Sequence, residues 1–327
     1  PRLVWILSGQ TSPGQIRAFE LRSVARTDGA TASAGVAAID DGEAIHLEAD
    51  GTPVLSYRYE KQPVPPDVDS VFERGGFIHP LRTPSGEVLT RIQPPDHWHH
   101  YGIWSPWTHT VFEGREVDFW NLGSRQGTVR PRAIVETTSG PVAGGFRSAL
   151  DHIDFTSGSE KIALNEQWEV TVWSPGETHM VDYVSTLNAA STEPLTLSAY
   201  RYQGFSIRAT EKWGDATSRL LTSEGLDKSN GNAERARWID ANGVSEAGRS
   251  GLLMMGHPTN RDYPERLRIW PTGMNAGVEN VFINFNPAQE HDWVIEPGRP
   301  EQARACTNGE RDLACGDRRR RRGRALV

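Results

Sequence analysis

Residues 162–172 read Ile-Ala-Leu-Asn-Glu-Gln-Trp-Glu-Val-Thr-Val, and this stretch decides the fold class of the chain. Its even positions are Ile162, Leu164, Glu166, Trp168, Val170 and Val172. Apolar residues at every second position are typical of a β-strand with one buried face. A glutamate on such a face costs free energy unless it is paired or used. Glu166 is therefore either a catalytic base beside a pocket or a salt-bridge partner at a sheet end, and Asp182 poses the same question more weakly.

Short alternating segments of this kind recur between residues that favour turns. They cover residues 3–7, 16–21, 53–59, 133–137, 162–173, 180–187, 195–202, 251–255 and 281–285. No stretch of a dozen residues shows the 3.6-residue apolar spacing of a helix. We therefore predict an all-β protein, most simply a large antiparallel two-sheet sandwich, with residues 1–300 as a single domain.

The last 27 residues differ from the rest in composition. Residues 301–327 hold eight arginines, four acidic residues and both cysteines, Cys306 and Cys315. Such a segment does not build a core, so we predict an irregular basic tail, which a shifted reading frame would explain. The whole chain still carries a formal net charge of -7, so we expect no nucleic-acid partner.

The sequence contains no apolar span of about 20 residues, so we expect no membrane insertion. The chain opens Pro-Arg-Leu-Val-Trp without a methionine, which predicts a truncated N-terminus. We expect a cytoplasmic protein, with secretion as the alternative. Nothing in the sequence predicts the oligomeric state.

Half of the ten histidines lie between His79 and His109, and three of them fall in Asp96-His97-Trp98-His99-His100. Pro94, Pro95 and Gly102 frame this cluster and indicate a loop. Imidazole serves as general acid, general base or metal ligand near neutral pH. The alternative is a structural loop whose imidazoles only satisfy backbone carbonyls and shield aromatic packing.

Several motifs together resemble a known bacterial family. They are His-Pro-Leu-Arg-x-Pro-x-Gly from His79, Pro-x-Asp-His-x-His-His-x-Gly-x-Trp from Pro94, Val-Asp-Phe-Trp ending at Trp120, and the segments 202–208 and 256–260. In this order they resemble the soluble family labelled "methane oxygenase PmoA", over most of residues 1–297. Together with the chain length, the resemblance implies a galactose mutarotase-like supersandwich.

Tryptophans and polar residues around the histidines suit a sugar ligand. Trp98, Trp104, Trp107 and Trp120 offer flat faces for sugar rings, although we expect at least two of the four to be core residues. The residues expected to bind the hydroxyl or carboxylate groups of a substrate are His79, Arg82, Asp118, Arg208, His257 and Asn260.

A divalent transition metal is an alternative occupant, and we commit to no cofactor. In an extended segment, His97 and His99 lie on one face and offer two nitrogens. His79, His100, Asp118 or His257 would supply a third ligand.

The leading hypothesis is a carbohydrate-active enzyme that acts on a sugar, uronic acid or keto-sugar by isomerisation, elimination or hydrolysis. His97, His99 or His100 would donate a proton while Glu166 or Asp182 acts as the base. The alternatives are a non-catalytic carbohydrate-binding protein, a metal-dependent oxygenase as the family label suggests, and a scaffold protein with a structural histidine cluster.

Overall fold

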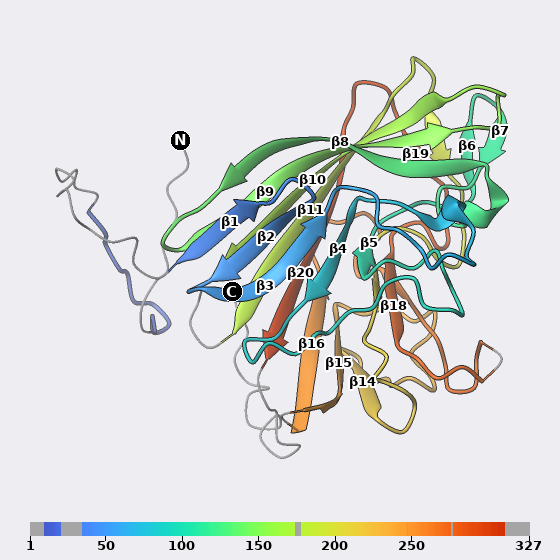
Figure 1. Cartoon of the computed structure of the whole chain (residues 1–327). Helices are drawn as coiled ribbons and strands as arrows, with labels where there is room; N and C mark the ends of the chain where they lie inside the picture. Colours follow the sequence, from blue (N-terminus) through green and yellow to red (C-terminus); the bar gives the residue numbers. More distant parts are fainter. Residues whose placement is uncertain (1–9, 21–34, 174–177, 247, 276, 311–327) are drawn as a thin grey trace.

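The computed structural model describes residues 10–20, 35–173, 178–246, 248–275 and 277–310. Over these residues the protein is all-β (Figure 1), and its only helical turns are the 3₁₀ segments η1 (Ser70–Phe72) and η2 (Leu122–Ser124). Every pair of neighbouring strands is antiparallel. The predicted fold class is confirmed. None of the described helical segments has the length and apolar character needed to cross a membrane.

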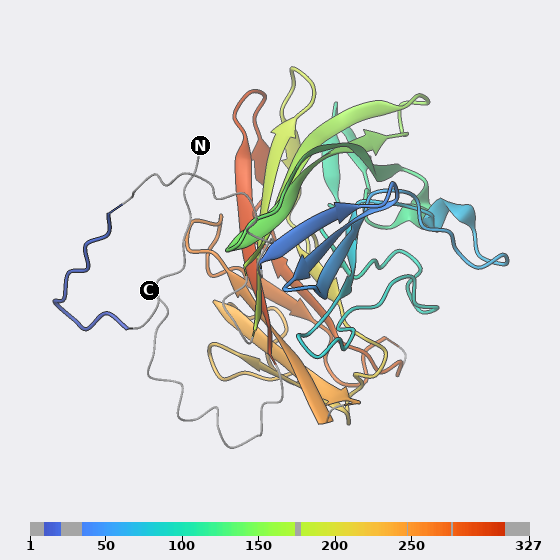
Figure 2. The ribbon, with the colours of Figure 1, turned by 60° about the vertical axis from the view of Figure 1, so that its left-hand side comes forward.

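Two eight-stranded sheets form the body of the protein. The first sheet has the order β1 (Val36–Asp40), β2 (Ala44–Ala49), β3 (Thr52–Arg58), β4 (Phe77–Leu81), β5 (Ile103–Trp104), β13 (Ser206–Arg208), β18 (Phe282–Asn286) and β17 (Arg266–Ile269). The second has the order β14 (Ser218–Thr222), β15 (Trp238–Ser245), β16 (Gly248–Gly256), β20 (Glu301–Glu310), β11 (His179–Ala189), β10 (Lys161–Trp173), β9 (Ala143–Asp154) and β8 (Gly127–Thr138). Figures 1 and 2 show β1–β3 lying beside β9–β11, so the two sheets share one core.

A third, four-stranded sheet was not predicted. Its order is β19 (Trp293–Ile295), β12 (Leu195–Leu197), β6 (Thr110–Phe112) and β7 (Arg115–Val117), and it lies at the upper right of Figure 1. Each of its strands has three residues. A strand that short shows too few alternations to be recognised from its pattern.

The stretch that decided the fold class is strand β10, as predicted. Leu164, Trp168, Val170 and Val172 are buried in the shared core. Ile162 is the exception, with 44% of its surface exposed, because the register with β9 shifts between Ile162 and Leu164. Such a β-bulge reverses the alternation at one end of a strand, which simple periodicity cannot anticipate.

The predicted irregular tail is wrong for its first ten residues. Residues 301–310 form β20, which pairs with β11 on one side and β16 on the other. Within residues 301–307 the buried side chains are the small or polar Ala305 and Thr307, so this part of the strand lacks an apolar signal. Backbone hydrogen bonds to two neighbours hold it in the sheet. Residues 311–327 lie outside the described residues.

Most other predicted strands coincide with observed ones. Residues 53–59, 133–137, 180–187, 251–255 and 281–285 fall largely within β3, β8, β11, β16 and β18. Residues 16–20 form no strand, and of residues 195–202 only the first three do. Residues 3–7 and residue 21 lie outside the described residues.

The first sheet has two apolar faces, and this property creates the candidate site. On β5 and β18, Ile103 and Ile283 point into the shared core, whereas Trp104 and Phe282 belong to a second cluster on the opposite face. Alternation along each strand separates the two sets. Loops that follow the strands fold over the second cluster and enclose a hollow.

Candidate active site

The histidine loop crosses the outer face of the first sheet. Turns close it, because the His97 N–H donates to the Pro94 carbonyl and the His100 N–H to the His97 carbonyl. Gly102 ends the loop with φ +61°, and a Cβ there would lie 2.3 Å from the Ile78 carbonyl oxygen. Glycine is therefore required where the chain enters β5.

The loop brings the three imidazole rings together. Ring centroids are 5.3 Å apart for His97 and His99, 4.7 Å for His97 and His100, and 5.0 Å for His99 and His100. His100 is buried, and it packs on Trp104 at 4.9 Å and Phe282 at 5.2 Å. The aromatic cluster thus supports the histidines from below.

A hollow of about 370 Å³, here called the histidine pocket, opens above these rings. It is lined by His97, His99, His100, Trp120, Asn121, Arg201, Tyr202, Arg268, Trp270, Met274, Asn275 and Phe282. Its size falls within the usual range for small-molecule sites, about 300–1,000 Å³. No aspartate or glutamate is among these described lining residues, which restricts the chemistry that the pocket supports.

Asp96 stands behind the pocket at the centre of a charged network. Its carboxylate accepts two hydrogen bonds from Nη2 of the buried Arg208, at 2.9 and 2.7 Å, and one from Nδ2 of Asn275 at 3.1 Å. It also contacts His97 Nδ1 at 3.0 Å. Burial alone would raise the pKa of Asp96, but the His97 hydrogen bond and the Arg208 charge lower this pKa well below its usual value. Asp96 is therefore an anion.

This network determines which nitrogen of His97 faces a ligand. An ionised carboxylate only accepts hydrogen bonds, so His97 Nδ1 must carry the hydrogen toward Asp96. Nε2 of His97 is then unprotonated in the neutral ring and available to accept a proton. Trp270 packs on the same ring with a centroid separation of 4.8 Å and limits its rotation.

The other two histidines are poor proton donors near neutral pH. Burial lowers the pKa of His99 to about 3, and the neighbouring His97 and Arg208 add to the effect. Burial also lowers the pKa of His100, followed by the influence of His99 and Arg208. Both rings are neutral at physiological pH. The prediction that a cluster imidazolium donates a proton is therefore unsupported for His99 and His100.

The same three histidines are the described residues best placed to hold a metal. One nitrogen from each ring lies within 4.8 Å of the others. A tetrahedral metal about 2.1 Å from each nitrogen would separate the ring centroids by roughly 5 Å, close to the observed spacings. The His97–Asp96 contact resembles the carboxylate that commonly orients a ligating histidine. The donor set therefore fits a divalent transition metal.

Four of the predicted site residues line the pocket, namely His97, His99, His100 and Trp120. Three more support it without lining it. Trp104 packs beneath His100, and Arg208 holds Asp96. The Asp118 carboxylate accepts hydrogen bonds from the Trp120 and Asn121 backbone N–H groups and thereby orients a pocket wall. Trp104, Trp107 and Trp120 are buried, as expected for at least two of the four tryptophans.

Four other predicted ligand-binding residues lie elsewhere. His79 and Arg82 line a separate hollow, where His79 Nδ1 contacts the Thr90 hydroxyl and burial lowers the pKa of His79 to about 4. His257 is exposed and bonds to Thr259. Trp98 is half-buried and does not line the histidine pocket. These placements correct the sequence-based site, because motif proximity did not imply a shared cavity.

Glu166 and Asp182, the carboxylates predicted as the base, do not line the histidine pocket. Glu166 is 3% exposed and accepts hydrogen bonds from Trp168 Nε1 at 2.6 Å and from the Ser185 hydroxyl at 2.5 Å. Its second oxygen lies 2.8 Å from His152 Nε2. Asp182 accepts from Trp173 Nε1 at 2.8 Å. Both carboxylates belong to the second sheet and satisfy local donors.

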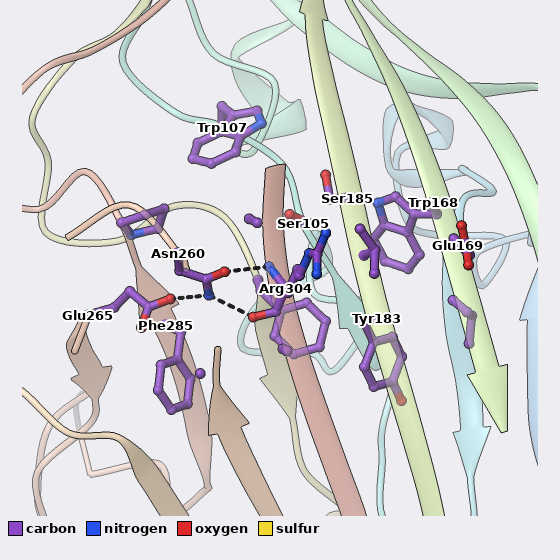
Figure 3. A pocket seen from close by; sticks show the side chains of 17 residues that line it. Ser105, Trp107, Trp168, Glu169, Tyr183, Ser185, Asn260, Glu265, Phe285 and Arg304 are labelled. Carbon is purple, nitrogen blue, oxygen red and sulfur yellow. Dashed lines mark hydrogen bonds between the residues drawn. The ribbon is translucent and has the colours of Figure 1, made fainter. Parts of the chain in front are cut away.

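Asn260 has a structural role beside a small inner cavity of about 30 Å³ (Figure 3). Its side chain donates to Glu265 and to the Arg304 carbonyl and accepts from the Arg304 N–H, which ties β20 to the loop after β16. The cavity has room for a water molecule but not for a sugar. Burial raises the pKa of Glu265 to about 7 against the opposing Asn260 hydrogen bond.

Glu265 should make the protein less stable as pH rises. The folded protein binds its proton more tightly than the unfolded chain, whose reference pKa is 4.5, so stability is lost between pH 4.5 and about 7. We expect Glu265→Gln to stabilise the protein by about 3 kcal/mol at pH 8 and little at pH 4. Urea unfolding at both pH values measures this, with the exposed Glu193→Gln as control. An equal effect at both pH values would contradict the assignment.

The sequence did not single out several residues that complete the pocket. They are Asp96, Asn121, Arg201, Tyr202, Arg268, Trp270 and Asn275. Asp96 directly precedes His97 in one quoted motif, and Tyr202 opens the quoted segment that ends at Arg208. These positions in the sequence were the signal that could have identified both residues. Trp270 and Asn275 come from the segment after β17, which has no diagnostic pattern.

The fold and the site define an all-β protein with a histidine-lined pocket on the outer face of one sheet. Comparison with family models identifies the family to which the chain belongs. It belongs to the family of unknown function DUF6807, whose model matches residues 44–306. The name of this family does not refer to methane oxygenase, the label of the family that the sequence motifs resemble. No curated protein sequence matches the chain.

Distant likenesses to solved structures also exist. Heparan sulfate lyase HepC from Pedobacter heparinus matches with a TM-score of 0.37 and 8% identity, over 87% of this chain and 36% of that one. A galactose mutarotase-like protein from Lactobacillus casei matches with a TM-score of 0.41 and 10% identity, over 84% of this chain and 100% of that one. The GH36 alpha-galactosidase AgaA from Geobacillus stearothermophilus matches with a TM-score of 0.35 and 10% identity, over 85% of this chain and 41% of that one.

Proposed function

We propose that the protein is a carbohydrate-active enzyme that moves a proton at a sugar carbon or hydroxyl, with His97 as the base. The observation that carries this proposal is the Asp96–His97 contact at the edge of an aromatic pocket. Nε2 of His97 accepts the substrate proton, and the Asp96 carboxylate stabilises the imidazolium that forms. Asp96 is a positioning residue because it does not line the pocket.

The lining favours isomerisation or elimination over hydrolysis by paired carboxylates. A retaining or inverting glycosidase of the usual kind needs two carboxyl groups on opposite sides of the bond, and the described lining has none. A single base suffices to remove a proton from a carbon next to a carbonyl or carboxylate. Trp270 and Tyr202 provide aromatic surface against which a sugar ring can pack.

The test combines binding with isotope exchange. Neutral sugars, uronic acids and 3-keto sugars are screened by thermal shift, and each stabilising compound is then incubated with the protein in D₂O. We expect deuterium to enter the substrate with wild type and at least about 100-fold more slowly with His97→Gln. His257→Gln is the matched control because His257 is exposed and outside the pocket. Stabilisation without exchange or product would instead identify a sugar-binding protein.

A metal-dependent reaction is the second candidate, favoured by the three imidazole nitrogens within 4.8 Å. It would use His97 Nε2 as a ligand and not as a base. Elemental analysis of purified protein distinguishes the two. About one transition metal per chain, with turnover lost to EDTA and restored by that metal, would replace the acid–base proposal.

A further inference from the structure

Two arginines at the histidine pocket have no acidic partner among the described residues. Arg201 and Arg268 both line the pocket, and neither forms an ion pair with a described carboxylate. Arg268 is half-buried and Arg201 is exposed, whereas the buried Arg208 is paired with Asp96. Two guanidinium groups that line one pocket repel each other when no anion lies between them.

The local contacts hold the two cations in place without neutralising them. Arg268 is on β17, next to β18 in the first sheet, and donates to the side-chain oxygen of Asn232 at 3.0 Å. Its Nε is buried and has no hydrogen-bond partner among the described residues. The Arg201 guanidinium lies over the rings of Tyr200 and Tyr202, at 5.5 and 5.6 Å. All of these partners are uncharged.

The electrostatic surroundings of Arg268 also indicate an excess of positive charge at the pocket. Burial lowers the pKa of Arg268, and the next largest cause is the positive charge of Arg201, so the two guanidinium groups are close enough to repel each other. Since Asp96 is already neutralised by Arg208, the pocket carries an excess of positive charge.

We infer that Arg201 and Arg268 form an anion subsite and that the substrate is an acidic sugar, bearing a carboxylate or a sulfate ester. This inference rests on the proposed function of the same pocket. Guanidinium groups bind both anions through paired N–H donors. Binding the anion there would leave the sugar ring between the aromatic walls and His97. A carboxylate held by two cations would also acidify the adjacent C–H bond, which suits a proton-abstracting base.

The experiment compares charged and neutral versions of one sugar. Glucuronate, glucose 6-sulfate and glucose are titrated by calorimetry against wild type, Arg201→Gln, Arg268→Gln and the double variant. Arg219→Gln, exposed on β14 of the second sheet, is the matched control. We expect each single variant to weaken at least one charged sugar about tenfold, with glucose unaffected. Thermal unfolding of each variant confirms that it folds.

The outcomes separate this inference from the proposed function. If all three sugars bind equally well to every variant, or if neither charged sugar binds wild type, the acidic-sugar subsite is overturned. If glucose undergoes His97-dependent exchange independently of both arginines, the proposed function survives and the subsite fails. If a charged sugar binds with arginine dependence but is never turned over, the subsite stands and the proposed function fails.

Discussion

Asp96→Asn is expected to lower kcat/KM about 1,000-fold or more, because an amide cannot stabilise the imidazolium of His97 as a carboxylate does. Steady-state kinetics on the substrate found by screening measure this loss.

The same substitution should also destabilise the protein. Arg208 is 1% exposed and bonds to Asp96 through two contacts, so the variant leaves a buried charge without compensation. Removing one partner of a buried ion pair costs about 3–5 kcal/mol. Adding Arg208→Gln should restore much of the stability but none of the activity. Full activity in folded Asp96→Asn would rule out the proposed role of the carboxylate.

Glu166→Ala is expected to lower the free energy of unfolding by about 3 kcal/mol or more while leaving turnover within about twofold of wild type. The change removes the acceptor for Trp168 Nε1 and the Ser185 hydroxyl and the partner of His152. Each buried donor left unpaired costs about 1–3 kcal/mol. Urea unfolding and kinetics at a temperature where the variant stays folded provide the two measurements.

Glu169→Ala is the control for this prediction. Glu169 lies on the same strand at an odd position, is half-buried and forms no ion pair with a described residue. We expect it to change stability by less than about 1 kcal/mol. A large loss of turnover in folded Glu166→Ala, absent from Glu169→Ala, would return Glu166 to the list of catalytic candidates.

The strands that could be predicted from the sequence are long and half-buried. β10 and β11 have 13 and 11 residues, enough alternations to show one apolar face. The three-residue strands and β20 were not predicted, because pairing with neighbouring strands, and not an apolar pattern, holds them in their sheets. Strand pairing is a long-range property that no local window contains.

The candidate site, like the fold, could be predicted from the sequence only in part. The loop from Asp96 to His100 concentrates chemistry within five residues, so sequence reasoning located it. Arg208 was expected at the site, but its pairing with Asp96 did not follow from the sequence, and neither did the presence of Arg268 and Asn275. These three residues are more than 100 residues away from the loop and reach it only through strand pairing and loop closure.

By itself, the sequence determined the all-β class, the buried face that carries Glu166 and the presence of a histidine cluster. Only the tertiary structure decided that Glu166 serves the core, that Asp96 is the carboxylate beside His97, and that two unpaired arginines share the pocket. The physical reason is that periodicity specifies which face of a strand a side chain occupies. Which residues meet on that face depends on the order and register of the strands.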